Sequence, residues 1–228
     1  MKAIYHGHSC VELKISKDGK DFTIFIDPFI TGNPMSDLEA KDVNCDYIIL
    51  SHGHADHFGD TIDLAKNNDA TVIATAEISY YLEARDVKAH AMNLGGAHNF
   101  PFGRVKLTLA HHSSSLPDGT YAGDPAGILL TNDNKTIYHA GDTALFLDMK
   151  LIGEMSKIDY AFLPIGDNFT MGVDDAVKAC QYTNSETVSP IHYNTFDVIK
   201  ADDGEFKRKI EAVGNKCNVL KAGDEAEI

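Results

Sequence analysis

The sequence predicts an α/β protein in which β-sheets carry helices on their outer faces. Three observations lead to this prediction: strand-like apolar runs open the chain, strands and helices alternate in its second half, and 43% of its 228 residues are hydrophobic. Such an order of elements is typical of sheets packed against helices. A chain of this length can bury one sizeable core. Because no Pro/Ser-rich linker or low-complexity tract divides it, we expect a single domain over residues 1–228.

The first half of the chain reads mainly as strands. One run stops at Asp27-Pro28, because proline cannot continue a ladder of backbone hydrogen bonds. A helix is indicated where Ile78, Tyr81 and Leu82 recur three and four residues apart. The expected strands are 3–5, 11–15, 22–26, 47–50, 71–74, 105–109, 127–130 and 136–139, the expected helices are 60–67 and 76–84, and residues 113–125 form a loop.

The second half alternates more regularly between helix and strand. Such alternation predicts βα units whose helices cover a sheet. The expected helices are 145–155, 174–181 and 204–213, and the expected strands are 160–163, 187–190 and 219–220.

Composition restricts the possible partners and the compartment. Acidic residues outnumber basic ones 34 to 20, and the net charge of −14 disfavours nucleic acid and anionic lipid surfaces. No run approaches the roughly 20 apolar residues that span a bilayer, and the start MKAIYHGHSC lacks the apolar region of a signal peptide. We therefore expect a cytoplasmic protein. Its four cysteines are far apart without a CxxC pair, which predicts reduced, mostly buried thiols.

The most informative segment is His52-Gly53-His54-Ala55-Asp56-His57, directly after an expected buried strand. Imidazole and carboxylate groups are ligands of borderline metals such as zinc. In an extended segment His52 and His54 project to the same side, while Asp56 and His57 can turn towards a neighbouring position. One segment can therefore supply two metal sites. The alternative is a polar loop with solvated histidines.

Further ligands are expected at the ends of three other strands. The segments that carry them are His111-His112, His139 to Asp142, and His192, and each follows an apolar run. Strand ends of this kind can converge at one edge of a sheet, where ligand sites lie in α/β proteins.

The chain contains the HGHADH segment, a later histidine, the GDT turn and a final histidine, in this order. This set of motifs resembles the metallo-β-lactamase superfamily. The phrases IDPF, SHGHADHFGD, AHHSSS, YHAGDT, PIGDNFTMG and PIHYNTF resemble its uncharacterised metal-dependent hydrolase branch, which is akin to ascorbate-6-phosphate lactonase-like proteins. The resemblance covers essentially the whole chain. It is specific for the superfamily and much less specific for the substrate.

The resemblance implies a four-layer αββα sandwich with a binuclear metal centre. The HSSS pattern favours His112 over His111 as a ligand, and His111 would then be packed or face solvent, because neighbours on a strand point to opposite faces. Asp27 would hold the backbone of the metal loop or a ligand imidazole in place. The implied ligands are His52, His54 and His112 for the first ion, Asp56, His57 and His192 for the second, and Asp142 as the bridge.

Other residues have open roles. His8 could be a proton donor or substrate contact, or a turn histidine bonded locally, and His139 could line the pocket or orient the GDT turn. Gly141 would permit a close approach of the backbone to the metals. Asp167 could line the cleft or cap a turn. The remaining histidines are predicted to take no part in the chemistry: His6 has a structural role, and His90 and His98 lie at surface or loop positions.

These residues predict a metal-dependent hydrolase in which a hydroxide shared by two ions about 3.5–4 Å apart attacks a small ester, lactone or phosphorylated metabolite. Asp56 and Asp142 would orient it, with His8 as a further catalytic candidate. Zinc is expected from the ligand chemistry, with manganese, nickel or iron as alternatives. The partner expected is a small substrate, which can be anionic, without nucleic acid or membrane, and assembly with a second copy of the chain is left open. The alternatives are a phosphodiesterase or nuclease of the same fold and a catalytically silent metal-binding protein.

Overall fold

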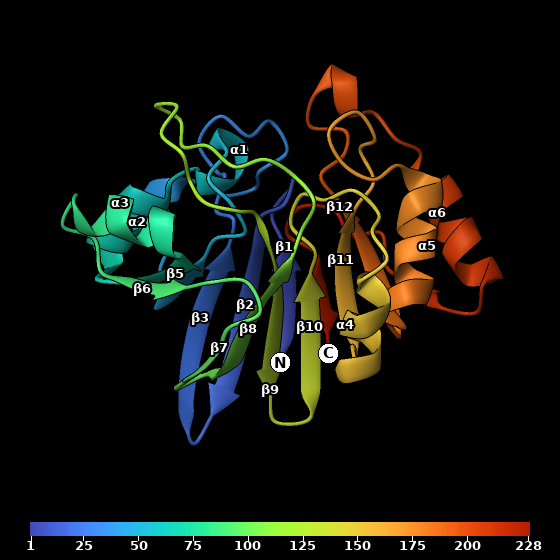
Figure 1. Ribbon diagram of the computed structural model, residues 1–228, viewed down its shortest axis with the longest axis horizontal. Helices are drawn as coiled ribbons and strands as arrows, with labels where there is room; N and C mark the ends of the chain where they lie inside the picture. Colours follow the sequence, from blue (N-terminus) through green and yellow to red (C-terminus); the bar gives the residue numbers. More distant parts are fainter.

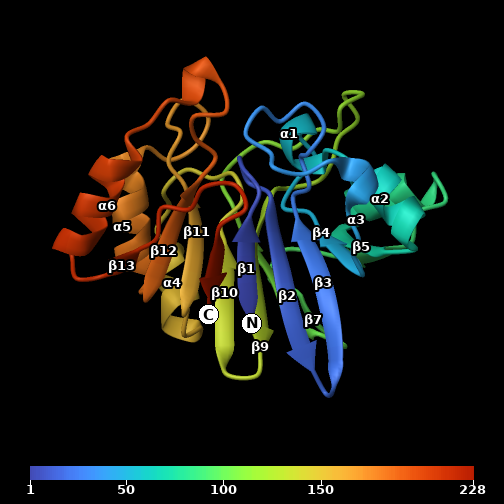
Figure 2. The ribbon, with the colours of Figure 1, turned by 180° about the vertical axis from the view of Figure 1, so that it is seen from behind.

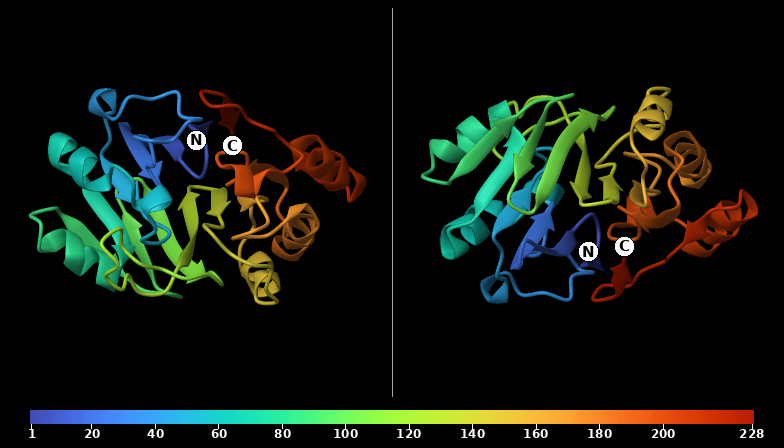
Figure 3. Two further views of the ribbon diagram at one scale, coloured as in Figure 1. Left: turned by 90° about the horizontal axis from the view of Figure 1, so that it is seen from above. Right: turned by 90° about the horizontal axis from the view of Figure 1, so that it is seen from below.

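The computed structural model describes residues 1–228 and shows two seven-stranded sheets that face each other, with helices outside both (Figure 1). The first sheet has the order β14-β1-β2-β3-β4-β5-β6 and the second β13-β12-β11-β10-β9-β8-β7. Seen along the strands, the layers follow one another as helices, sheet, sheet and helices (Figure 3). The predicted four-layer α/β architecture is therefore confirmed.

The strands of the first sheet are β14 (Glu225–Glu227), β1 (Lys2–Tyr5), β2 (Val11–Lys17), β3 (Lys20–Ile26), β4 (Tyr47–Ile49), β5 (Thr71–Thr75) and β6 (Ala89–Met92). Those of the second are β13 (Lys216–Cys217), β12 (Thr187–Ile191), β11 (Tyr160–Pro164), β10 (Lys135–His139), β9 (Ala126–Asn132), β8 (Gly103–Leu109) and β7 (Ala97–Phe100). Helices α1 (Ala55–Phe58), α2 (Thr61–Asn68) and α3 (Ala76–Glu83) accompany the first sheet, and α4 (Met149–Met155), α5 (Val173–Thr183) and α6 (Asp203–Ala212) the second. None of these helices is long and apolar enough to cross a bilayer.

Because side chains alternate between the two faces of each strand, the two sheets form three separate hydrophobic cores. Between the sheets, Leu13 and Ile24 of the first sheet belong to the same buried cluster as Leu107 and Ile128 of the second. The alternate residues face outward, where Ile48 packs with the helices of the first sheet. A third cluster joins the second sheet to α5 and α6. Because side chains of a strand alternate between its faces, each inner strand serves two cores at once.

The two chain ends meet in the first sheet, where β14 pairs antiparallel with β1 in the register Lys2↔Glu227 (Figure 2). The expected strand 219–220 is therefore wrong. Residues 219–220 instead carry the chain from the second sheet to the first, so that Val219 packs against the outer core and Leu220 against the inner one. A two-residue apolar pattern does not distinguish such a crossing from a strand.

The structure differs from the expected elements at several further places. The expected helix 145–155 begins only at Met149, because Phe146 stacks on His111 and the Ala144 amide donates to the His111 carbonyl, which hold this segment as a loop. Strands β6, β7, β13 and β14 and helix α1 were not expected. All five are short, and the four strands lie at sheet edges, where the apolar pattern is weak.

Asp159, buried before β11, is predicted to stabilise the protein in a pH-dependent way. Its carboxylate accepts the Thr136 amide hydrogen at 3.0 Å and contacts Lys135 and Lys157, each at 3.1 Å. Burial opposes the charge, but these partners lower the pKa of Asp159 below its ordinary value of 3.8. Because the folded-state pKa is lowered, this contribution is present above pH 4 and disappears as the pH falls. Asp159→Asn should lower the free energy of unfolding by about 1 kcal/mol at pH 7 and by less at acid pH.

Urea unfolding at both pH values measures this difference. Asp133→Asn is the control, because Asp133 is exposed at a positive φ of 50° in the turn between β9 and β10, a conformation that asparagine tolerates. A difference between wild type and Asp159→Asn that does not change with pH would contradict the role of the charge.

Candidate metal centre

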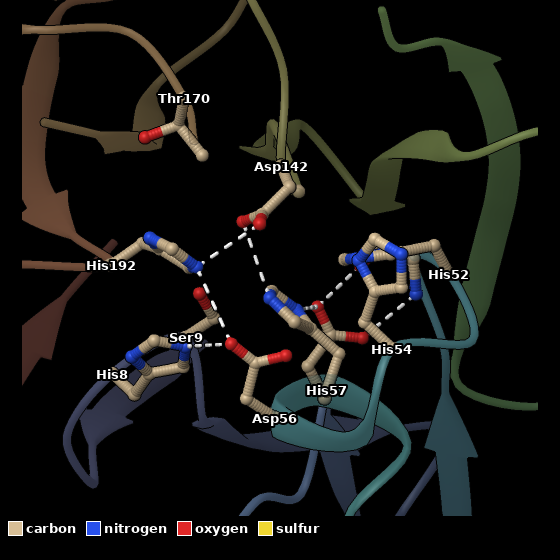
Figure 4. Close-up of polar contacts among 12 residues, drawn as sticks. His8, Ser9, His52, His54, Asp56, His57, Asp142, Thr170 and His192 are labelled. Carbon is tan, nitrogen blue, oxygen red and sulfur yellow. Dashed lines mark hydrogen bonds and ion pairs between the residues drawn. The ribbon is translucent and has the colours of Figure 1, made fainter. Parts of the chain in front are cut away.

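The predicted ligands meet at one end of the molecule, above the carboxyl ends of β4, β8, β10 and β12 (Figures 1 and 4). The first sheet supplies His52 and His54 from the loop after β4, and Asp56 and His57 from α1. The second sheet supplies one residue after each of three strands: His112, Asp142 and His192. Residues up to 140 positions apart in the chain thus become neighbours because both sheets present strand ends to the same edge.

Three ligand groups emerge from the distances between side-chain atoms. In each group the nitrogen and carboxylate oxygen atoms lie within 4.8 Å of one another. The groups are His52, His54 and His112; His8, Asp56, His57 and His192; and His52, His57 and Asp142. The first two correspond to the two sets implied by the resemblance, with His8 in addition.

Asp142 lies between the two sets, as a bridging residue must. Its carboxylate oxygens are 3.2 Å from His57 Nε2, 3.5 Å from His112 Nε2 and 3.0 Å from His192 Nε2. The carboxylate is 3% exposed, so it faces the cluster and not bulk water. This position after β10 brings one carboxylate within reach of both sets.

Several buried atoms of these side chains have no hydrogen-bond partner within the cluster, which fits a site for a metal ion. His57 Nε2, both ring nitrogens of His192 and Asp142 Oδ1 are buried and make no properly oriented hydrogen bond, although short distances separate several of them. Buried polar groups are normally hydrogen-bonded. Atoms that lie close together without pointing at each other are expected where all of them point at a common ion.

Electrostatics agree with a site for cations. Burial opposes a charge on His57 and His192, but the neighbouring Asp142 raises the pKa of His57 well above its ordinary value and the pKa of His192 to about 9. Burial lowers the pKa values of His52, His54 and His112. The carboxylates thus favour the protonated forms of His57 and His192, and bound metal ions would displace those protons.

Asp27 sets the orientation of two ligand histidines, as predicted. It is fully buried, accepts the Ser51 amide hydrogen at 2.8 Å and accepts the Nδ1 hydrogen of His57, also at 2.8 Å. The Ser51 hydroxyl donates to the same carboxylate and accepts from His52 Nδ1 at 3.0 Å. In the neutral form of both histidines the hydrogen is thereby placed on Nδ1, which leaves Nε2 for a metal once any second proton is displaced.

Close packing fixes the metal loop. A side chain at Gly53 would approach Ala122 Cβ to 2.5 Å, and the Gly53 amide donates to Ser114 Oγ at 3.1 Å. The serine run after His112 therefore supports the loop. Ser51 is a further supporting residue that the sequence reading missed, since a serine after a strand carries no distinctive signal.

Gly141 allows the GDT turn to approach the metal loop. Its φ is +61°, and a Cβ there would meet the Ala126 carbonyl oxygen at 2.8 Å and Ser51 Cβ at 2.9 Å. Gly141→Ala should therefore lower the free energy of unfolding by about 2–5 kcal/mol, the sum of a left-handed backbone and overpacking.

Gly119→Ala is the matched control in chemical unfolding, because its φ is +84° and nothing lies within 4 Å of the added Cβ. It should lose only the backbone part, about 1–2 kcal/mol. Equal losses in the two variants would show that the packing around Gly141 has no effect.

The remaining candidates have clear positions. His111 is exposed and stacks on Phe146 at 4.7 Å. His139 accepts the Gly141 amide hydrogen and donates to the Ser9 carbonyl, so it orients the GDT turn. Asp167 is exposed in a turn. His6 is buried between Glu12 and Asp37, consistent with a structural role. His98 is exposed and His90 half-buried, in keeping with the surface alternative, but both lie on strands, β6 and β7, and not in loops, with ring centroids 4.3 Å apart.

His8 lies inside the second set and is fully buried. Its Nε2 is 3.1 Å from Asp56 Oδ2, and its Nδ1 is 2.9 Å from Thr195 Oγ1 (Figure 4). Burial lowers the pKa of His8 to about 4, although the hydrogen bond with Asp56 opposes this shift. Thr195 was not predicted, because nothing in the sequence relates it to a histidine 187 positions earlier.

Known proteins share both the sequence and the fold. The model of the beta-lactamase superfamily domain matches residues 23–193. UPF0173 metal-dependent hydrolases of Bacillus cereus (strain B4264) and Bacillus thuringiensis subsp. konkukian are each 56% identical to this chain, and the match covers 98% of both chains.

Solved structures agree. Igni18, a metallo hydrolase from the archaeon Ignicoccus hospitalis, is 36% identical, with a TM-score of 0.89 over 100% of this chain and 98% of its own. A possible metal-dependent hydrolase from Veillonella parvula shares the fold, with a TM-score of 0.79 at 16% identity over 100% of this chain and 99% of that one. The chain therefore belongs to the metallo-β-lactamase superfamily and is a metal-dependent hydrolase.

Proposed function

We propose that the chain holds two divalent ions, zinc in the first instance, and hydrolyses a small ester, lactone or phosphorylated metabolite. The observation that supports this most directly is the set of buried, unpartnered nitrogen and carboxylate atoms on His57, His192 and Asp142. His52, His54 and His112 would hold the first ion, Asp56, His57 and His192 the second, and Asp142 both. When bound, such ions supply a water of lowered pKa and polarise the bond to be broken.

The chain's own residues would prepare this chemistry. Asp27 keeps the Nδ1 hydrogens of His52 and His57 engaged, so that Nε2 of each ring is aimed at the centre. Asp142 and Asp56 place negative charge between the histidines, and Asp142 is almost entirely shielded from water. Preorganised charges in such a site need little reorganisation during reaction.

The surroundings favour a small substrate. Phe29 and Phe196 flank His8 with ring centroids 5.6 Å away, which gives the second set an apolar wall. None of the ion pairs formed by the ligand residues involves a lysine or arginine. A negatively charged substrate would therefore have to be attracted by the ions themselves, and the net charge of −14 disfavours a large polyanion.

Metal analysis combined with a substrate panel tests the proposal. The purified protein is assayed for bound metal and for hydrolysis of a lactone, a thioester, a phosphomonoester and a phosphodiester, before and after chelation and metal return. We expect about two ions per chain and chelator-sensitive hydrolysis of a small carbon or phosphorus ester. Preference for the phosphodiester would instead support the phosphodiesterase alternative. Two bound ions without hydrolysis of any substrate would support a catalytically silent metal-binding protein.

A further inference from the structure

We propose that His8 and Thr195 are positioning residues that fix the carboxylate of Asp56 for the second ion, and that His8 itself does not bind the metal. This inference deepens the function proposed above and rests on its two-ion centre. The side chains form one chain of contacts, from Thr195 Oγ1 to His8 Nδ1 at 2.9 Å and from His8 Nε2 to Asp56 Oδ2 at 3.1 Å.

Asp56 needs such a partner more than the other carboxylates do. Its side chain is 30% exposed, against 3% for Asp142 and 0% for Asp27. His8 is its one hydrogen-bond partner, and the nearest approach of His192 Nε2 is 3.8 Å. An exposed carboxylate at the start of the four-residue helix α1 would otherwise be free to turn towards solvent, at an entropic cost to ligation.

The hydrogen-bonding capacity of the two neighbours determines the tautomer of His8. An ionised Asp56 can only accept a hydrogen bond, so Nε2 must carry the hydrogen, whereas the Thr195 hydroxyl can donate to Nδ1. This is the arrangement by which an outer residue commonly orients a metal ligand. A ligand nitrogen has to be free of other hydrogen-bond partners, as Nε2 of His57 is, and neither nitrogen of His8 is unpartnered.

The backbone of His8 also connects the two sheets at this site. His8 has a φ of +56° and His192 a φ of +52°, conformations that are unfavourable for non-glycine residues and are maintained by their surroundings. The His192 amide donates to the His8 carbonyl at 2.8 Å, and the Tyr5 hydroxyl reaches the same carbonyl at 3.2 Å. One residue thus contacts two members of the second set, Asp56 through its ring and His192 through its backbone.

The ring has no space to turn away from Asp56. It is fully buried, with Phe29 and Phe196 at its edges and the His192 ring centroid at 4.2 Å. Such packing locks a rotamer, which is the condition for precise placement of a ligand. A direct proton transfer from His8 to substrate, one of the roles that the sequence left open, does not fit a ring whose two nitrogens are both engaged.

Two variants of His8 distinguish positioning of Asp56 from direct binding of the metal. His8→Gln places an amide nitrogen near the position of Nε2 and can still donate to Asp56, but its amide nitrogen cannot bind a metal. His8→Asn is too short to reach Asp56, and it tolerates the left-handed backbone. Thr195→Val removes the hydroxyl with almost no change in shape. Metal-free protein is titrated with Zn²⁺ against a chromophoric chelator, and the melting curve of each metal-free variant shows whether it folds.

We expect His8→Asn to weaken the second, weaker-bound ion by about 10–100-fold and to leave the first unchanged. His8→Gln should restore most of that affinity. Thr195→Val should weaken the second ion by up to about 10-fold, with no further loss when combined with His8→Asn. These readouts do not require a substrate, so a wild-type protein that binds two ions but hydrolyses nothing would overturn the proposed substrates and not this inference.

Three results would overturn the inference. An equal loss of the second ion in His8→Gln and His8→Asn would make His8 a direct ligand. An unchanged affinity in His8→Asn and Thr195→Val would leave both residues with a purely structural role. A wild-type protein that never binds a second ion would remove both this inference and the two-ion centre.

Discussion

Asp142→Ala is expected to remove at least one metal ion and to reduce hydrolysis below detection. Asp142 is the only carboxylate within 3.5 Å of histidines from both ion sets. Loss of a residue that merely orients a ligand typically costs 10–100-fold in metal affinity. The loss of a shared ligand should therefore exceed about 100-fold for the less tightly held ion.

The same substitution should also alter the metal-free protein. Asp142 raises the pKa values of His57 and His192 against the effect of burial, so its removal leaves two buried imidazoles without their main counter-charge. Breaking a buried charge pair by removing one partner costs about 3–5 kcal/mol. Urea unfolding in the presence of a chelator measures this loss separately from metal content.

Asp167→Asn is the matched control for Asp142→Ala. Asp167 follows β11, neighbour of β10 in the second sheet, but it is exposed in a turn, and asparagine tolerates its φ of +62°. Metal stoichiometry and stability should both remain at the wild-type level. An Asp142→Ala protein with unchanged metal content would refute the bridging role.

Asp27→Asn is expected to weaken metal binding although Asp27 touches no ion. One carboxylate oxygen accepts from both His57 Nδ1 and the Ser51 hydroxyl, and the other accepts from the Ser51 amide. An amide offers one oxygen and one NH₂ group, so a donor must face a donor whichever way it is turned. The simplest relief is a change of tautomer in His57, which moves the hydrogen to Nε2 and aims it at the metal position.

We therefore expect Asp27→Asn to lower the affinity for the ion held by His57 by about 10–100-fold and to lower the free energy of unfolding by about 3 kcal/mol. Competitive titration with a chelator and urea unfolding measure the two effects. Asp46→Asn serves as the control, because Asp46 also accepts a backbone hydrogen bond, from Thr23, but is exposed and precedes β4, whereas the metal loop follows that strand. Wild-type metal affinity in Asp27→Asn would disprove the tautomer argument.

The strongly patterned parts of the fold were predictable. Strand 11–15 alternates apolar and polar residues and 22–26 is almost wholly apolar, and they occur as β2 and β3 with small differences at their ends. The edge strands β6, β7, β13 and β14 were missed, because an edge strand contributes few side chains to a core and so leaves a weak pattern. The expected strand 219–220 failed for a related reason: apolar residues there serve two different cores while the chain crosses between sheets.

By itself, the sequence determined the chemistry of the centre: the residue types, the HGHADH spacing and the order of motifs that identifies the superfamily can all be read along the chain. The tertiary structure decided how the donors are controlled. That Asp27 sets the tautomers of His52 and His57, and that Thr195 reaches His8, depends on contacts between residues 24 to 187 positions apart. Hydrogen-bond geometry of this kind arises only when strand ends from two sheets pack at one edge, so no local pattern along the chain can encode it.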